Sequence, residues 1–168
     1  MELGQPFYED LKYTICFIRS GDEILLLNRE HPTWMGRWNG VGGKIRPGET
    51  PHESVLREVK EETGIFLEEA KFKGVVSWIS DEVRTGGMYL YFAELPRDFR
   101  LSTPVKTEEG ILDWKKISWI LHPRNEGVTD SMPRYFPAML NEAGYFDHRC
   151  VYQQGVLISF QSIPLGNV

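Results

Sequence analysis

The segment from Gly43 to Ile65 constrains the fold of this 168-residue chain more than any other. It joins a loop rich in glycine and proline to a helix whose two ends are both marked in the sequence. Thr50 is a capping residue, Pro51 occupies the first helical position, and Glu53 follows three places after the cap. Gly64 is of the residue type that most often closes a helix. These signals predict a helix of about four turns.

The predicted helix carries its carboxylates on one side. At about 100° per residue, Glu58, Glu61 and Glu62 fall on one stripe, and the adjoining face is apolar. Carboxylates this close repel one another unless bound cations offset their charge. Such hard oxygen ligands select Mg²⁺, with Mn²⁺ as a substitute, and substrate phosphates complete the coordination shell. A merely solvated acidic face is the usual meaning of a run of Glu residues, but it would need neither Arg57 nor the glycine loop.

Residues 43–65 match the Nudix box, G-x5-E-x7-R-E-U-x-E-E-x-G-U with U an aliphatic residue, at every specified position. The chain therefore resembles the Nudix hydrolases. The resemblance implies an α/β (α+β) fold in which a mixed β-sheet is sandwiched between α-helices. It also implies hydrolysis of a phosphoanhydride bond, in which a metal-activated water attacks phosphorus in a nucleoside diphosphate derivative.

The resemblance also assigns roles to individual residues. Arg57 is expected to pair with a box carboxylate, Glu49 first, and to orient it, whereas an ordinary surface ion pair would be worth under about 1 kcal/mol. The general base is left open between Glu58 and Glu61. For Glu109, the neighbouring Glu108 gives an alternative register, and solvation of a loop is the alternative role. The expected metal ligands are the carbonyl of Gly42 and the carboxylates of Glu58, Glu61, Glu62 and Glu109.

The stretch from Gly36 to Lys44 resembles that of MutT-type enzymes, which hydrolyse oxidised purine nucleoside triphosphates. In that group the Asn of this stretch hydrogen-bonds the base, and an amide can donate and accept at once. Asn39 is therefore the first candidate for purine recognition, although Asn-Gly is also a common turn pair. Around residue 130 the sequence lacks the Trp and paired acids of the best-known pattern. The expected substrate contacts are Thr14, Arg29, Asn39, Lys44 and Asp130, of which Thr14 could equally be a plain strand residue.

The rest of the sequence predicts one Nudix domain over residues 1–168. Seven glycines or prolines in residues 31–49 predict a long loop without regular elements. Strands are expected at 12–19 and 23–29, paired as an antiparallel hairpin, at 71–80 and 86–95, and at 113–120; a short helix is expected at 133–143 and a final hairpin at 149–161.

Composition excludes several classes of partner. A net charge of −5 argues against binding to a long polynucleotide but allows a small nucleotide. We expect no membrane association and a cytoplasmic protein, because the chain has no run of 18 apolar residues and does not begin with a signal peptide. Cys16 and Cys150 lie in apolar runs and are expected to be buried in a reducing compartment, although a disulfide between them is left open.

Three functions remain open at this point. The first is a nucleoside triphosphate pyrophosphohydrolase, acting on oxidised purine deoxynucleotides such as 8-oxo-dGTP and releasing the monophosphate and pyrophosphate. The second keeps the chemistry but acts on ADP-ribose, a dinucleoside polyphosphate or a pterin triphosphate. The third is a module that binds a nucleotide without turnover, for which the loss of box acids would be expected.

Overall fold

The computed structural model of the chain describes residues 8–165, apart from residues 100 and 142. A mixed sheet of ten strands forms its centre, with the strand order β10-β9-β5-β6-β1-β2-β8-β7; β3 pairs with β2, and β4 pairs with β1. The strands are β1 (Tyr13–Ser20), β2 (Glu23–Arg29), β3 (Trp38–Asn39), β4 (Val41–Lys44), β5 (Lys71–Ser80), β6 (Val83–Glu94), β7 (Val105–Lys106), β8 (Gly110–Lys116), β9 (Phe146–Gln153) and β10 (Val156–Pro164). The helices are α1 (Pro51–Thr63), α2 (Ile117–Ile120) and α3 (Met132–Asn141).

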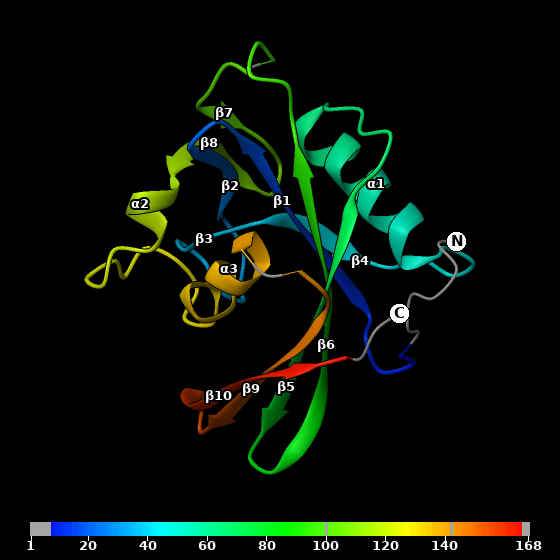
Figure 1. Ribbon diagram of the computed structural model, residues 1–168, viewed down its shortest axis with the longest axis vertical. Helices are drawn as coiled ribbons and strands as arrows, with labels where there is room; N and C mark the ends of the chain where they lie inside the picture. Colours follow the sequence, from blue (N-terminus) through cyan, green and yellow to red (C-terminus); the bar gives the residue numbers. More distant parts are fainter. Residues whose placement is uncertain (1–7, 100, 142, 166–168) are drawn as a thin grey trace.

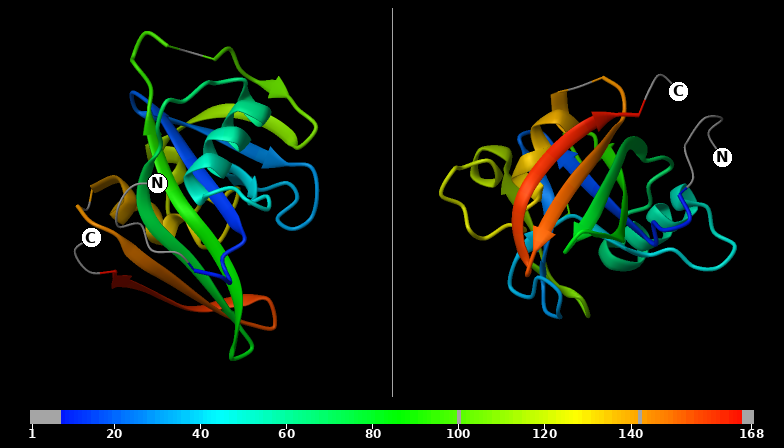
Figure 2. Two further views of the ribbon diagram at one scale, coloured as in Figure 1. Left: turned by 90° about the vertical axis from the view of Figure 1, so that its right-hand side faces the viewer. Right: turned by 90° about the horizontal axis from the view of Figure 1, so that it is seen from below.

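The sheet lies between helices, as predicted, with α1 on one side and α2 and α3 on the other (Figure 1). The alternation of side chains along β1 explains this arrangement, because successive residues point to opposite faces of a strand. Cys16 belongs to the core that contains Val55 and Val59 of α1. Ile15 and Phe17 belong to the second core, which contains the apolar face of α3. In Figure 2 (left), α1 lies in front of the central strands.

Strands β1 and β2 pair at one end only and diverge along the rest of their length. The predicted hairpin is present, but β1 pairs with β2 only from Ile18 to Ser20. The first half of β1 pairs instead with β4, and β3 pairs with β2 at Leu27 and Asn28. Residues 38–44 thus form two short strands, so the prediction of a loop without regular elements was wrong there. Gly42 permits the close approach of β4, because a Cβ atom on it would lie 2.0 Å from the Thr14 carbonyl oxygen.

Helix α1 has the boundaries that its sequence predicts. The Thr50 side chain accepts a hydrogen bond from the Glu53 amide, and the Glu53 side chain accepts one from the Thr50 amide. Gly64 ends the helix in the left-handed conformation, with φ of 73°, and its amide donates to the Lys60 carbonyl. Both ends of this helix are therefore fixed by local contacts.

The strand predicted at residues 113–120 is correct only in its first part. β8 runs from Gly110 to Lys116, and the next four residues form α2. The reason lies in the partner strand, because Lys116 pairs with Glu23, the first residue of β2. Beyond that point the ladder has no partner in β2, and the Ile117 amide bonds the carbonyl of Asp22 in the turn.

The later elements agree with the predictions to within a few residues. Strands β5 and β6 are antiparallel, β9 and β10 form the final hairpin, and α3 covers most of the expected helix. Residue 142 of that expected helix, and residues 1–7 at the start of the chain, lie outside the described residues. Cys16 and Cys150 are buried and free. In the described part of the chain, no helix combines the length and apolar character needed to cross a membrane.

Candidate active site at the Nudix box

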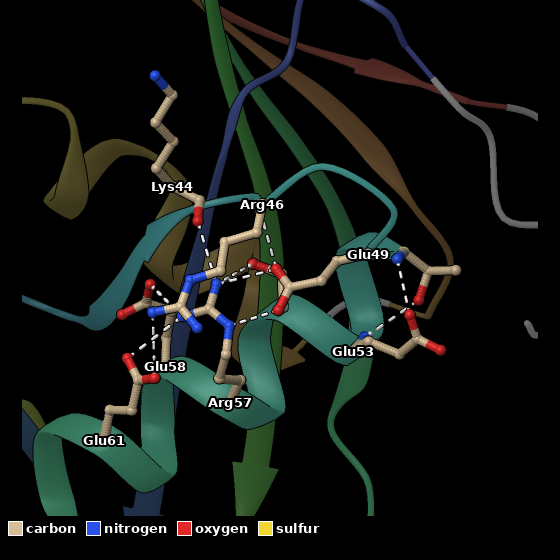
Figure 3. Close-up of polar contacts among 9 residues, drawn as sticks. Lys44, Arg46, Glu49, Glu53, Arg57, Glu58 and Glu61 are labelled. Atoms are coloured by element: carbon tan, nitrogen blue, oxygen red, sulfur yellow. Dashed lines mark hydrogen bonds and ion pairs between the residues drawn. The ribbon is translucent and has the colours of Figure 1, made fainter.

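Arg57 on α1 holds the acids of the box together (Figure 3). Its guanidinium binds both carboxylate oxygens of Glu49, with Nη2 2.9 Å from Oε2 and Nε on Oε1. Nη1 donates to Glu58 at 2.8 Å and to Glu61 at 3.2 Å, and Nη2 also donates to the Lys44 carbonyl at 3.2 Å. The predicted pairing of Arg57 with Glu49 is present, and it is bidentate.

The Arg57–Glu49 pair fixes the loop before the helix. Glu49 accepts a further hydrogen bond from the Arg46 amide at 2.9 Å, so one carboxylate joins the loop to the helix. The hydrogen bond from Arg57, together with that amide, lowers the pKa of Glu49 to about 2. Glu49 is therefore ionised at neutral pH, and its charge is matched by Arg57.

Strand β4 brings two glycines against the acids of α1. A Cβ atom on Gly43 would lie 2.6 Å from Oε1 and 2.8 Å from Oε2 of Glu58. The Gly42 amide donates to Oε2 of Glu62 at 3.3 Å. Glycine is required at 43 by the Glu58 carboxylate and at 42 by the close approach of the Thr14 carbonyl oxygen.

Glu62 lies in surroundings that disfavour its charged form. Burial, followed by repulsion from Glu58 and a smaller contribution from Glu109, raises the pKa of Glu62 to about 8. The Gly42 amide and Arg29 act in the opposite direction without cancelling the effect. Glu109 directly precedes β8 and is distant from Glu62 in the sequence, but it lies close enough for its charge to act on Glu62.

These acids fit a divalent cation, because a cation between them would relieve the repulsion that raises the pKa of Glu62. Oxygen ligands are also what Mg²⁺ prefers. In residues 8–165, leaving out 100 and 142, no three Asp, Glu, His or Cys side chains converge closely enough to hold an ion as they stand. Glu58 is turned toward Arg57, and Glu62 toward the Gly42 amide. Binding of a metal ion would therefore need the carboxylates to come closer together.

A cleft of about 690 Å³ starts at the glycines of β4 and extends over the face of the sheet. It lies where β1 and β2 separate, so residues from both strands line it together with the loop at residues 32–37. Tyr13 and Trp78 contribute aromatic rings with centroids 6.3 Å apart. Other lining residues include Thr14, Arg29, Arg37, Asn39, Gly42, Gly43, Met88, Thr129, Ser131 and Tyr152.

The cleft brings together three of the five expected substrate contacts. Thr14, Arg29 and Asn39 line it. The Asn39 side-chain oxygen accepts from the Gly40 amide at 2.9 Å, which leaves its amide nitrogen to donate to a ligand. The exposed Lys44 side chain points away from the Arg57 network (Figure 3) and is not part of the cleft lining. Asp130 lies behind the lining, where it accepts a hydrogen bond from Tyr152.

Sequence reasoning missed several lining residues. Thr129 and Ser131 flank Asp130 and reach the cleft, while Asp130 itself does not line it. Tyr152 comes from the final hairpin and reaches the cleft because β9 pairs in parallel with β5, in register with Ser80. No local pattern marks the two hydroxyls, because residues 129–131 lie in a turn and not in a strand. No local signal marks Tyr152, because its position depends on the pairing of distant strands.

Comparison with known proteins assigns the family. The Nudix domain family matches residues 11–133. An uncharacterised Nudix hydrolase of Bacillus subtilis is 31% identical over 108 residues, which are 64% of this chain and 66% of that protein. The oxidized purine nucleoside triphosphate hydrolase of Mus musculus is 25% identical over 152 residues, covering 88% of this chain and 91% of that protein. The crystal structure of a MutT protein from Bacillus halodurans superposes with a TM-score of 0.70 at 27% identity, covering 89% of this chain and 95% of that one.

The chain therefore belongs to the Nudix hydrolase family, whose members need divalent metal ions and act on nucleotide substrates. The fold predicted from the box is confirmed by the same comparisons. The match spans just under two thirds of the length of the Bacillus subtilis relative.

Proposed function

We propose that this chain is a Mg²⁺-dependent nucleoside triphosphate pyrophosphohydrolase that converts oxidised purine deoxynucleoside triphosphates, such as 8-oxo-dGTP, to the monophosphate and pyrophosphate. The observation that carries the proposal is the continuity of one cleft, which reaches from the glycines beside the box acids to an aromatic wall with hydrogen-bonding groups. A triphosphate and its base could occupy these two parts at once.

The end of the cleft at β4 suits phosphates. Arg29 and Arg37 line it, and the charge of Arg29 acts on Glu62. Carbonyl oxygens of His31 and Pro32 hold the Arg29 side chain, at 3.0 and 3.1 Å. An arginine that is already held in place loses less freedom when it binds a phosphate oxygen.

The rest of the cleft suits a base. Tyr13 and Trp78 offer aromatic surface, and Asn39 offers amide N–H groups. Thr14 is only 3% exposed, and its hydroxyl has no hydrogen-bond partner among the described residues. A buried hydroxyl without a partner costs about 1–3 kcal/mol, which a ligand could recover.

In the proposed mechanism Glu58, Glu61, Glu62, Glu109 and the Gly42 carbonyl would hold Mg²⁺. Bound Mg²⁺ would neutralise phosphate charge and acidify the attacking water. Glu58 or Glu61 would take a proton from that water as general base. Arg57 keeps both within reach through Nη1, while its bidentate pair with Glu49 fixes the guanidinium.

A substrate panel tests the proposal. We expect kcat/KM with Mg²⁺ to be highest for 8-oxo-dGTP when it is compared with dGTP, dATP, ADP-ribose and diadenosine polyphosphates. The relative from Mus musculus, whose name gives oxidized purine nucleoside triphosphates as its substrate, supports this ranking. A preference for ADP-ribose or a dinucleoside polyphosphate would overturn the proposed substrate but keep the chemistry. Tight binding without turnover would point to a binding module.

Glutamine substitutions separate the two candidate bases. Glu58→Gln and Glu61→Gln keep the size of each side chain but cannot accept a proton. We expect the variant that lacks the general base to lose at least about 100-fold in kcat at saturating Mg²⁺. If Glu58→Gln kept a turnover near that of the wild type, Glu58 would be removed from the catalytic set.

A further inference from the structure

Tyr152 has a fixed position in the wall of the cleft. It lies near the end of β9, in register with Ser80 of β5, and both residues line the cleft. Its hydroxyl donates a hydrogen bond of 3.0 Å to Oδ1 of Asp130, which precedes α3. The ring is thus held by the sheet at one end and by the chain entering α3 at the other.

The hydrogen bond to Asp130 determines what Tyr152 can offer to a ligand. A phenol has one hydrogen, and an ionised carboxylate can only accept. Burial, followed by the charge of Asp130, raises the pKa of Tyr152 above its ordinary value, so the phenol keeps its proton at neutral pH. With that proton directed to Asp130, the phenol oxygen can only accept from a partner in the cleft. The Ser131 side chain also hydrogen-bonds with Tyr152, which leaves one lone pair of the phenol oxygen for a ligand.

A second observation indicates a polar ligand near this point. Thr129 precedes Asp130, is 2% exposed and lines the cleft, and its hydroxyl lacks a hydrogen-bond partner within the part of the chain that the structure describes. Thr14 lines the same cleft, and its buried hydroxyl also has no hydrogen-bond partner among the described residues. Buried polar atoms are normally paired in proteins, so two unpaired hydroxyls on residues that line one cleft indicate a ligand with hydrogen-bonding groups.

We propose that Tyr152 is a specificity-determining residue that accepts a hydrogen bond from an N–H group on the edge of the substrate base, and that Asp130 is its positioning residue. This inference rests on the proposed function and names the feature of the base that is selected. Oxidation of a purine at C8 converts N7 from an acceptor into an N–H donor. An acceptor in the wall would therefore favour 8-oxo-dGTP, whereas the N7 lone pair of dGTP would repel it.

The test compares kcat/KM for 8-oxo-dGTP and dGTP in the wild type and in Tyr152→Phe. The substitution removes the oxygen and keeps the ring. We expect the preference for 8-oxo-dGTP to fall about tenfold, the usual effect of losing one discriminating hydrogen bond. Tyr145→Phe is the matched control, because Tyr145 lies just before β9 and packs against Phe72 in the other core. Its preference should equal that of the wild type.

A binding measurement without metal supplies a second readout. The Kd values of 8-oxo-dGMP and dGMP, measured by calorimetry in EDTA, should show the same loss of preference in Tyr152→Phe. Asp130→Asn keeps an oxygen that can accept from Tyr152 and should retain most of the preference. Asp130→Ala leaves the hydroxyl free to turn and donate, so its preference should fall as in Tyr152→Phe. A general structural defect would lower kcat/KM for both triphosphates, and weaken the binding of both monophosphates, by the same factor.

One result would overturn the inference alone, namely a Tyr152→Phe variant that keeps the wild-type ratio in both kcat/KM and Kd. A wild type that hydrolyses both triphosphates without distinguishing them would overturn the inference together with the proposed preference for oxidised purines, but not the pyrophosphohydrolase activity. A wild type that neither hydrolyses these triphosphates nor binds the monophosphates would instead overturn the proposed function, and the inference with it.

Discussion

At the scale of single residues, Arg57 controls the geometry of the box. Its guanidinium contacts Glu49, Glu58 and Glu61, and its side chain is only 17% exposed. Planar and bidentate contacts of this kind need the fork of a guanidinium, which a lysine ammonium does not provide. Arg57 therefore positions three carboxylates in addition to balancing their charge.

We expect Arg57→Lys to lower kcat by at least about tenfold and stability by about 1–2 kcal/mol, because one ammonium cannot hold all three acids. Steady-state kinetics and urea unfolding measure the two effects. Arg84→Lys is the control, since Arg84 likewise pairs with a carboxylate, that of Asp10, but lies outside the site. If the Arg57→Lys variant had a kcat within twofold of the wild type, the role assigned to the network would be wrong.

Glu62 gives a prediction about removal of metal. Its pKa of about 8 in the native protein lies above the ordinary value of 4.5. Between these two pH values the native protein holds a proton that the unfolded chain has lost. The metal-free protein is therefore stabilised at low pH, and this stabilisation is lost as the pH rises through 8. In EDTA at pH 8.5, Glu62→Gln should raise stability by about 1–3 kcal/mol, since one unit of pKa is about 1.4 kcal/mol. Saturating Mg²⁺ should stabilise the wild type more than the variant. Equal Tm values in EDTA would contradict the prediction.

At the scale of elements, the contact between β4 and α1 forms the metal end of the cleft. β4 pairs with β1 along Tyr13–Cys16, which fixes Gly42 and Gly43 beside the acids of the helix. Helix α1 is fixed in turn by its two caps and by Val55 and Val59 in the core. Two independently anchored elements thus meet at Glu58 and Glu62.

Gly43→Ala tests this contact, because the added methyl group would meet the Glu58 carboxylate. We expect at least a tenfold loss of kcat together with weaker Mg²⁺ binding, measured by activity over a Mg²⁺ titration. Gly127→Ala is a suitable control, since a Cβ there would meet the end of the Asn125 side chain at 3.2 Å. Normal Mg²⁺ dependence in Gly43→Ala would contradict the prediction, because it would show that Glu58 can move without weakening the binding of Mg²⁺.

The elements also show what can be predicted from this sequence. Helix α1 could be predicted to the residue because Thr50, Glu53 and Gly64 form its caps through local contacts. Strands β3 and β4 could not be predicted, because glycine-rich segments become strands only when β1 and β2 separate and pair with them. The end of β8 is likewise set by the first residue of its partner strand.

The residues of the site likewise divide into those that local sequence predicts and those that it does not. Glu58, Glu61, Glu62 and Arg57 follow from their spacing within one helix, so the sequence brings them together directly. Glu109 lies outside the helix and was expected only from the family resemblance. Thr14, Arg29 and Asn39 were expected from a family resemblance, and the structure places them on one cleft. Tyr152 and Thr129 reach the same cleft through the pairing of β9 with β5 and the approach to α3, which no short segment encodes.

At the scale of the whole molecule, the two faces of the sheet pack against different helices. One face is covered by α1, and the other carries α3 and the second core. His148 is buried on β9, where its ring stacks against Phe160 and Nδ1 contacts the Ser162 hydroxyl at 2.8 Å. This histidine therefore links β9 to β10 in its neutral form.

Burial lowers the pKa of His148 to about 4, which predicts acid lability. Between about pH 6.5 and 4 the unfolded chain binds a proton that the native protein does not, so stability is full above pH 6.5 and falls as the pH falls. We expect a loss of about 1–2 kcal/mol between pH 7 and pH 5, measured by urea unfolding. His148→Phe should show a smaller loss over this interval. An equal loss in both proteins would assign the effect to other groups.

In the function proposed above, the box and the cleft together convert a nucleoside triphosphate to a monophosphate and pyrophosphate. The most direct measurement is the identity of the products that the chain forms from 8-oxo-dGTP with Mg²⁺, separated by ion-exchange chromatography, with Glu62→Gln assayed in parallel. We expect equal amounts of 8-oxo-dGMP and pyrophosphate, with a large loss of rate in the variant. Release of orthophosphate and 8-oxo-dGDP, or cleavage of ADP-ribose without any cleavage of triphosphates, would contradict it.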